Sequence, residues 1–147
     1  MAKVLFIQTN YDIDHPEERT PWMPLALMQL ATFIKEKGHE AIILDRNLYF
    51  DNKRLIYILK KFNPDIVGMT CYTSTMIKDM KQVARITKEN SSALVIIGGV
   101  HATLEPKSLL DFQYIDYVVR GEGEEALFEI CEVIDKKRAI EKNIAKI

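Results

Sequence analysis

The stretch Leu94-Val95-Ile96-Ile97-Gly98-Gly99-Val100-His101-Ala102-Thr103 decides the fold. Its four leading apolar residues, three of them β-branched, predict a short strand that is buried on both faces, as in a parallel sheet. The two glycines let the backbone turn in conformations that other residues avoid, and they leave main chain open to a ligand. In open α/β sheets, ligands bind in the crevice beyond the carboxyl ends of the strands. The stretch therefore predicts a binding site with Gly98 and Gly99 at its floor.

Four further apolar runs have the same character and alternate with segments of helical period. Together with the first stretch they predict five strands, at residues 3–8, 40–44, 65–70, 94–97 and 114–119. Alternating strands and helices predict one parallel sheet with helices on both faces, because right-handed crossovers place them there. We therefore expect an α/β fold, a flavodoxin-like and Rossmann-like three-layer sandwich. Its five-stranded parallel sheet is expected to have the order 2-1-3-4-5.

The helices are predicted from their apolar faces and from end signals. Their expected starting residues are, in chain order, Pro21 and Pro24, Asp51 or Asn52, Ser74 or Thr75, Glu105-Pro106, and a residue just before Ala126. One binding domain is expected over residues 1–135. Residues 136–147 are charged and have no glycine at their end, so they are expected to form a helical extension or a linker.

Length and charge restrict the class of protein. The 147 residues have the size of one domain, and a net charge of −1 gives no electrostatic footprint for nucleic acid or for an anionic membrane. No apolar run approaches the roughly 18 residues that span a bilayer, and the first residues lack the pattern of a secretory signal. Cys71 and Cys131 are isolated, which indicates neither a disulfide framework nor a zinc site. The expectation is a cytoplasmic protein without nucleic-acid or membrane partners.

Loops follow four of the predicted strands, at residues 9–21, 70–75, 98–105 and 120–124. The carboxyl ends of parallel strands meet at one edge of the sheet, so these loops are expected to line one ligand site. The first loop is long for a strand-to-helix connection, which usually takes about 2–6 residues. The last loop contains glycines but no Lys-Ser/Thr pair, and its acidic side chains would repel a phosphate.

Five collinear segments give the chain a family resemblance over nearly its whole length. They are Pro24-Leu25-Ala26-Leu27, Lys37-Gly38-His39-Glu40, Pro64-Asp65-Ile66-Val67-Gly68, Ile97-Gly98-Gly99-Val100-His101-Ala102-Thr103 and Asp116-Tyr117-Val118-Val119-Arg120-Gly121-Glu122-Gly123-Glu124. In these segments the chain resembles the cobalamin-binding domain at the amino terminus of many cobalamin-dependent radical SAM enzymes. The resemblance implies that the ligand is a corrinoid, cobalamin.

Cobalamin-binding domains of the wider class carry three marks. Gly98-Gly99 matches the Gly-Gly mark, which makes room for the nucleotide tail beside the sheet. Thr70-Cys71-Tyr72 stands where the class has Ser-x-Leu, so Tyr72 places a bulky ring where a smaller group is usual. The Asp-x-His-x-x-Gly mark, whose histidine coordinates cobalt, is absent, because residues 12–18 have His15 at the wrong spacing and no glycine. The resemblance therefore implies base-off cobalamin without a histidine or any other metal ligand from this chain.

The expected site residues come from the four loops and the resemblance together. The cofactor-binding residues that we expect are Thr9, Asn10, Tyr11, Thr70, Tyr72, Thr73, Gly98, Gly99, Val100, His101, Ala102, Gly121 and Glu122. His101 is expected to contact the corrin without coordinating cobalt, and His15 is expected to be solvated. No catalytic residue is assigned.

The chemistry implied by the resemblance needs a second domain. A radical SAM cluster requires Cys-x-x-x-Cys-x-x-Cys, and Cys71 and Cys131 are too far apart in sequence to supply it. S-adenosylmethionine and the iron–sulfur cluster are therefore expected on a missing radical SAM catalytic domain, in cis or in trans. There the cobalt would carry a methyl group to an unactivated carbon or phosphorus. The chain alone is not expected to be catalytic.

Other function classes stay open at this point. A flavodoxin-like module for FMN or another nucleotide needs a phosphate loop rich in Ser, Thr and Gly after the first strand, whereas residues 12–18 are largely acidic. A vestigial cobalamin domain that acts only in protein interaction is the third class, and Tyr72 gives a reason to consider it. A receiver domain is disfavoured, because its third strand should end in an acid and this one ends in Thr70.

Overall fold

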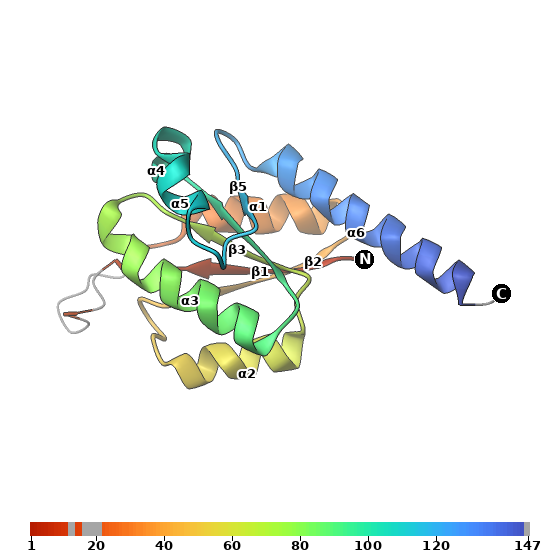
Figure 1. Cartoon of the computed structure of the whole chain (residues 1–147), viewed down its shortest axis with the longest axis horizontal. Helices are drawn as coiled ribbons and strands as arrows, with labels where there is room; N and C mark the ends of the chain where they lie inside the picture. The colour runs from red at the N-terminus through yellow and green to blue at the C-terminus, as the bar shows by residue number, and fades with distance from the viewer. Residues whose placement is uncertain (12–13, 16–21, 146–147) are drawn as a thin grey trace.

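The centre of the molecule is one parallel sheet (Figure 1). The computed structural model describes residues 1–11, 14–15 and 22–145. The strands are β1 (Lys3–Gln8), β2 (Glu40–Asp45), β3 (Ile66–Thr70), β4 (Leu94–Gly98) and β5 (Tyr117–Val118), and their order is β2-β1-β3-β4-β5. Every neighbouring pair is parallel. The predicted α/β class and strand order are confirmed.

Helices cover both faces of the sheet (Figure 1). They are α1 (Leu25–Glu36), α2 (Asn52–Phe62), α3 (Ile77–Asn90), α4 (Val100–Leu104), α5 (Pro106–Leu110) and α6 (Glu124–Ile144), with a short 3-10 helix η2 (Ser74–Met76). Side chains of β1 alternate between the two apolar layers. Leu5 and Ile7 belong to the layer of α2 and α3, whereas Val4 and Phe6 belong to the layer of α1 and α6. A strand buried on both faces is what a continuous apolar run predicts.

The second helix begins as its sequence predicts. The Asp51 carboxylate accepts the backbone N–H of Lys53 and so caps α2. Such a cap satisfies one of the N–H groups that have no partner within the helix. For the first helix, Pro24 is the N-cap residue of α1, and Pro21 lies outside the described residues.

The prediction that Ser74 or Thr75 caps the third helix is wrong. Both residues lie inside η2, and Met76, the N-cap residue of α3, makes no side-chain capping bond. The Thr75 hydroxyl shares a 2.7 Å hydrogen bond with the Thr73 hydroxyl instead. A tight turn of 3-10 helix at the start of an α-helix moves the cap position by a few residues, and a polar-residue pattern does not show this shift.

Two elements beside the glycines differ from the sequence prediction. Gly98 and Gly99 lead directly into α4, which was not predicted because a helix of five residues is too short to display a helical period. β5 is shorter than predicted, since only Tyr117 and Val118 pair with β4. The predicted short helix after Glu105 is confirmed as α5.

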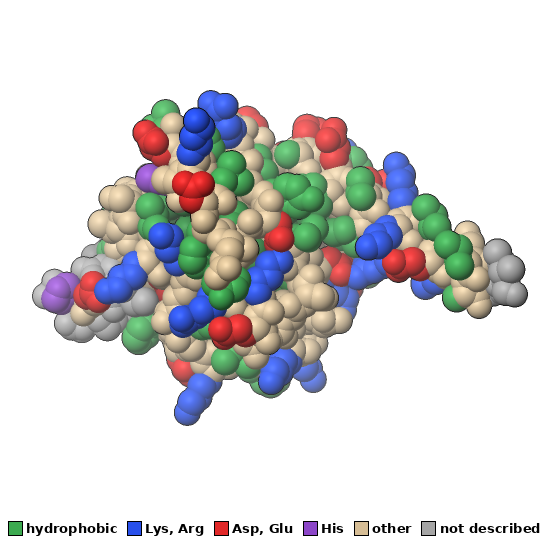
Figure 2. All heavy atoms as spheres, in the orientation of Figure 1, with side chains coloured by type: hydrophobic (Ala, Val, Ile, Leu, Met, Phe, Trp, Pro, Cys, Tyr) green, Lys and Arg blue, Asp and Glu red, His purple; other side chains and the backbone are tan. Residues whose placement is uncertain are grey.

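The long helix α6 extends past the edge of the sheet (Figure 1). Leu127 and Cys131, in its first half, are buried in the core, and the residues beyond 135 are exposed. Figure 2 shows basic, acidic and hydrophobic side chains along this exposed length. The division into residues 1–135 and 136–147 stays a prediction. Within the described part of the chain, no helix combines the length and apolarity that crossing a membrane requires.

Candidate functional site

A cavity of about 390 Å³ opens at the carboxyl ends of β3 and β4. The sheet forms one wall through Phe6, Gly68 and Ile96, and helices α1 and α6 form the opposite wall through Leu27, Leu30 and Leu127. The lining is therefore largely apolar. Ligand sites in proteins commonly combine such a lining with a few polar groups at fixed positions.

Gly99 lies at the cavity in a backbone conformation that favours glycine. Its φ is +99°, which L side chains rarely adopt. A Cβ atom there would lie 2.7 Å from Thr70 Oγ1 and 2.9 Å from the carbonyl oxygen of Cys71. Backbone hydrogen bonds hold this close approach, because Cys71 N–H donates to Gly98 O (2.9 Å) and His101 N–H donates to Cys71 O (3.0 Å). The turn therefore has no room for a side chain.

Gly98 and Gly68 also line the cavity. A Cβ atom on Gly98 would have only Val119 O nearby, at 4.0 Å, so its missing side chain leaves free space. A Cβ atom on Gly68 would lie 3.1 Å from the Phe6 ring. Glycine inside a strand commonly marks a close approach of backbone or ligand. Gly68 was not among the predicted site residues, although its place in an apolar strand was a usable signal.

Thr103 connects the loops that follow β4 and β5. Its hydroxyl donates to Gly99 O (3.0 Å) and accepts the N–H of Gly121 (3.0 Å). The guanidinium Nε of Arg120 donates to Thr103 O (3.3 Å). Thr103 lines the cavity. It lies in the loop 98–105 that the sequence predicts to face the ligand, but it is not among the predicted site residues, because a lone threonine carries no distinctive sequence signal.

Apolar side chains at the cavity remain accessible to solvent. Tyr72 is 39% exposed, Val100 is 54% exposed and Leu104 is 72% exposed. All three line the cavity, from the loops after β3 and β4. Single exposed apolar residues are ordinary, but a group of them around a cavity indicates a surface that a ligand or partner covers.

Seven of the predicted site residues meet at this cavity. They are Thr70, Tyr72, Gly98, Gly99, Val100, Gly121 and Glu122. They come from three separate loops, which confirms that these loops share one edge of the sheet. The sequence reasoning missed the contribution of the two helices, since Ala26, Leu27, Gln29 and Leu30 on α1 and Leu127 on α6 also line the cavity. The apolar residues among them show only the pattern of helix packing.

Six other predicted residues lie outside the cavity lining, namely Thr9, Asn10, Tyr11, Thr73, His101 and Ala102. Thr9, Asn10 and Ala102 are fully buried. His101 Nε2 lies 3.1 Å from the Ser108 hydroxyl, away from the cavity lining. The Thr9 hydroxyl donates to Thr70 O (3.5 Å), so the end of β1 is in contact with a cavity residue. Most of the loop 9–21 lies outside the described residues.

The cavity lining contains no histidine or cysteine among the described residues. Burial raises the pKa of the nearby Cys71 thiol to about 11, so it is protonated at neutral pH. His39, Glu132 and Asp135 are close enough to hold a cation, but they lie at the amino end of the strands. There His39 Nδ1 accepts the N–H of Ala2 (3.2 Å), and carboxylate oxygens of Glu132 and Asp135 lie 3.4 Å from Nε2 and 3.5 Å from Nδ1. Among the described residues, the cavity lining offers the carboxylates of Glu122 and Glu124 but no imidazole or thiolate to a metal.

Sequence comparisons identify relatives of the chain. The family model for the B12 binding domain matches residues 19–130. An uncharacterized methyltransferase of Pyrococcus horikoshii is 39% identical over 122 residues, which cover 80% of this chain and 26% of the relative. The anaerobic magnesium-protoporphyrin IX monomethyl ester cyclase of Rubrivivax gelatinosus is 34% identical over 143 residues, which cover 92% and 25%. The chain spans about a quarter of the length of these relatives.

Solved structures agree with this relationship. The radical S-adenosylmethionine methyltransferase TsrM from Kitasatospora setae, with cobalamin and a [4Fe-4S] cluster bound, matches with a TM-score of 0.78 and 25% identity. The match covers 93% of this chain and 25% of that one. A cobalamin-binding protein from Desulfitobacterium hafniense shares the fold, with a TM-score of 0.58 and 16% identity over 89% of this chain and 57% of its own. The chain belongs to the B12 binding domain family and is related to cobalamin-dependent radical SAM methyltransferases.

Proposed function

We propose that the chain binds cobalamin with its nucleotide tail in the cavity and presents the corrin to a radical SAM methyltransferase domain. The observation that carries this proposal is the position of the cavity, which opens beside Gly98 and Gly99 at the carboxyl ends of β3 and β4. The family supports a corrinoid as the ligand.

The residues present fit such a ligand. The nucleotide tail of cobalamin ends in an aromatic base, and an apolar cavity of about 390 Å³ accepts an aromatic group. Gly68 and Gly98 leave space beside the sheet, and Leu30 and Leu127 close the opposite side. Tyr72, Val100 and Leu104 supply an apolar rim for the corrin ring. These residues bind and orient the cofactor and exclude water from its tail.

The same cavity supports the base-off part of the proposal, in which the chain supplies no cobalt ligand. When the nucleotide tail is inserted beside the sheet, its base no longer coordinates the cobalt. The described cavity lining offers no histidine or cysteine to replace it, and the raised pKa of Cys71 keeps that thiol protonated. The bound corrinoid supplies a cobalt centre that can carry a methyl group.

The catalytic half belongs to another domain in this proposal. Both cysteines of the chain are buried and free, Cys71 in the loop after β3 and Cys131 on α6, so they cannot hold a cluster. Relatives about four times as long have room for a catalytic domain. S-adenosylmethionine and the iron–sulfur cluster are assigned to that domain, in cis or in trans.

Gel filtration with hydroxocobalamin tests the proposal. The chain is mixed with hydroxocobalamin at high micromolar concentration, and the visible spectrum of the protein peak is recorded. Co-elution of the corrinoid supports the proposal, and its absence contradicts it. FMN is the matched control, and co-elution of FMN alone would indicate a flavodoxin-like module. After reduction to cob(II)alamin, electron paramagnetic resonance is expected to show no nitrogen splitting, whereas a nitrogen triplet would contradict base-off binding without a histidine.

A further inference from the structure

The segment of residues 119–123, which joins β5 to α6 and is called the β5–α6 loop below, forms part of the cavity wall. Gly121, Glu122 and Gly123 of this loop line the cavity. A Cβ atom on Gly123 would lie 3.5 Å from Leu30 Cδ2, so the loop comes into contact distance of α1. The loop thus closes the cavity between the sheet and the first helix.

The sheet holds only the beginning of this loop. β5 is an edge strand of two residues that pairs with β4. The Val119 N–H donates to Ile97 O (2.8 Å), but β4 ends at Gly98 and the chain then turns into α4. No strand therefore continues beside the residues that follow Val119. Segments with few backbone hydrogen bonds to their neighbours open locally at a low free energy, so the loop needs an anchor outside the sheet.

The Thr103 side chain on α4 provides such an anchor. Its hydroxyl has one proton, which it donates to Gly99 O (3.0 Å), and its oxygen then accepts the Gly121 N–H (3.0 Å). Gly121 has a φ of +74°, so the loop turns sharply at this contact. Arg120 Nε donates to Thr103 O (3.3 Å) and gives the loop a second contact with the same residue. One threonine thus continues the link between the β4 and β5 segments past the end of the sheet.

We propose that Thr103 is a positioning residue for the nucleotide tail, because its hydroxyl holds the β5–α6 loop closed over the cavity. The inference rests on the proposed function and deepens it. The single hydroxyl proton already points to Gly99 O, so Thr103 acts through the loop and does not donate to the ligand. The loop lines the cavity that is proposed to hold the tail, whereas Tyr72, Val100 and Leu104 form the rim for the ring. Loss of the hydroxyl should therefore affect the tail and not the ring.

Two variants of Thr103 isolate the role of the hydroxyl. Thr103→Val keeps the branched shape and removes the hydroxyl, and Thr103→Ser keeps the hydroxyl and removes the methyl group. The start of α4 keeps its backbone hydrogen bond in both variants, because the residue 103 N–H donates to Gly99 O (3.0 Å). Urea denaturation measures how far each variant is folded, and corrinoid affinity is expressed per folded molecule.

The first measurement needs no ligand. Hydrogen exchange of the Gly121 amide is followed by nuclear magnetic resonance, with the Val119 amide as the internal reference on the sheet. We expect Gly121 to exchange about fivefold faster in Thr103→Val than in Thr103→Ser, because a lost hydrogen bond has about that effect, while Val119 exchanges equally in both. Equal exchange of Gly121 in the two variants would overturn the inference.

The second measurement is a titration with cobalamin and with cobinamide, a corrinoid without the nucleotide tail. We expect Thr103→Val to bind cobalamin about fivefold more weakly than Thr103→Ser, and the two variants to bind cobinamide equally. Equal affinities for cobalamin would overturn the inference, and so would a loss of the same size for cobinamide. Failure of the unaltered chain to bind either corrinoid would instead contradict the proposed function, and the exchange of Gly121 would still decide whether Thr103 holds the loop.

Discussion

Gly98 and Gly99 are adjacent, but they serve the cavity for different physical reasons. Gly99 has a φ of +99°, and a Cβ atom would clash with Thr70 and Cys71. Gly98 has space around its missing Cβ and an ordinary strand conformation. Gly98 thus leaves space that the proposed ligand would use, whereas Gly99 is required by the backbone. Separate substitutions distinguish these two requirements.

Gly98→Val is expected to weaken cobalamin binding while the chain stays folded. Valine suits a strand, so the free energy of unfolding should change by less than about 1 kcal/mol. The added side chain occupies the space proposed for the tail, so we expect cobalamin affinity to fall about tenfold or more. A tenfold loss corresponds to roughly 1.4 kcal/mol of binding free energy, which the loss of a small buried apolar area is enough to cause. Visible-spectrum titration and urea denaturation measure the two quantities. Unchanged affinity in the folded variant would contradict the assignment of the cavity.

Gly99→Ala is expected to act mainly on stability. Its backbone conformation and the 2.7 Å approach to Thr70 Oγ1 are both unfavourable for a Cβ atom. Such strain costs on the order of 1–3 kcal/mol. Urea denaturation should therefore show a clear loss in the free energy of unfolding, and Gly98→Ala serves as the matched control with a smaller loss. Equal losses for the two glycines would argue against the difference described above.

The two cysteines allow a prediction about pH. Burial raises the pKa of Cys71 to about 11 and that of Cys131 to about 12, from a value of 9.0 in an exposed thiol. In the folded chain both thiols stay protonated at pH 8 and should react slowly with a thiol reagent, while urea should make both react fast. Above pH 9 the unfolded chain loses these protons first, so the free energy of unfolding is expected to fall from about pH 9 towards 11. Fast labelling of the native chain at pH 8 would contradict the burial.

At the scale of elements, α6 contributes to two different parts of the molecule. Its first half closes the cavity through Leu127, and its second half extends past the sheet. In the second half, the Arg138 guanidinium pairs with the Asp65 carboxylate and donates to Met1 O. The Arg138 side chain is 45% exposed and the Asp65 side chain 13%, so solvent reaches the pair from the Arg138 side.

Removal of residues 136–147 is expected to leave corrinoid binding unchanged. The deletion loses the contact of Arg138 with Asp65, and an exposed ion pair of this kind contributes about 1 kcal/mol or less. Arg138→Ala in the full-length chain is the matched control and should lose a similar amount in urea denaturation. A large loss of cobalamin affinity in the shortened chain would show that the binding unit does not end near residue 135.

The strands were predictable because their apolar runs are continuous. Burial on both faces leaves the same signal in β1, β3 and β4, and strand order then follows from alternation with helices. The wall that α1 and α6 contribute to the cavity was not predictable in the same way. An apolar residue that faces a core and one that faces a cavity have the same sequence pattern, so Leu30 and Leu127 carried no separate signal.

Polar residues after a strand were harder to interpret. Thr9 and Asn10 follow β1 at the expected edge, and both were assigned to the ligand. In the structure Asn10 donates its N–H to Asp79, which is 69 positions later in the chain, and both residues are fully buried. A contact over that separation is set by the packing of α3 on the sheet. No local pattern around Asn10 contains it.

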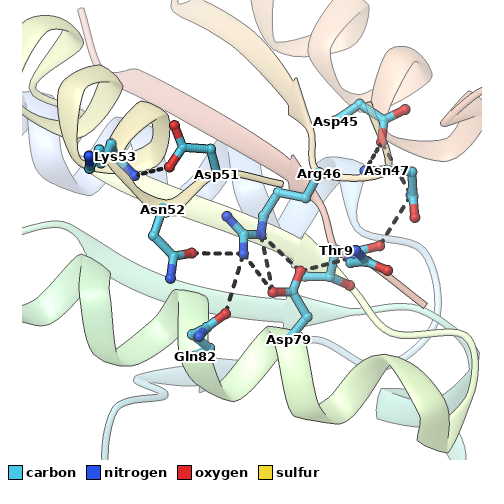
Figure 3. A network of polar contacts seen from close by, with 10 residues as sticks. Thr9, Asp45, Arg46, Asn47, Asp51, Asn52, Lys53, Asp79 and Gln82 are labelled. Atoms are coloured by element: carbon cyan, nitrogen blue, oxygen red, sulfur yellow. Dashed lines mark hydrogen bonds and ion pairs between the residues drawn. The ribbon is translucent and has the colours of Figure 1, made fainter. Parts of the chain in front are cut away.

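At the scale of the whole molecule, the two faces of the sheet are built differently. The face under α1 and α6 contains the apolar cavity, and the face under α2 and α3 contains the buried ion pair between Arg46 and Asp79 (Figure 3). The cavity opens at the carboxyl edge of the sheet, where the exposed rim of Tyr72, Val100 and Leu104 lies. The proposed site therefore lies at one edge of the sheet, in a chain that spans about a quarter of the length of these relatives.

Comparison of cobalamin with cobinamide in an equilibrium titration tests the central claim most directly. The two ligands share the corrin ring, and only cobalamin has the nucleotide tail that the cavity is proposed to hold. We expect the unaltered chain to bind cobalamin about tenfold more tightly or better, because the tail buries apolar surface in the cavity. We also expect Gly98→Val to abolish this preference. Equal affinity for the two corrinoids, or a preference that survives in Gly98→Val, would contradict the claim that the cavity beside the two glycines holds the tail.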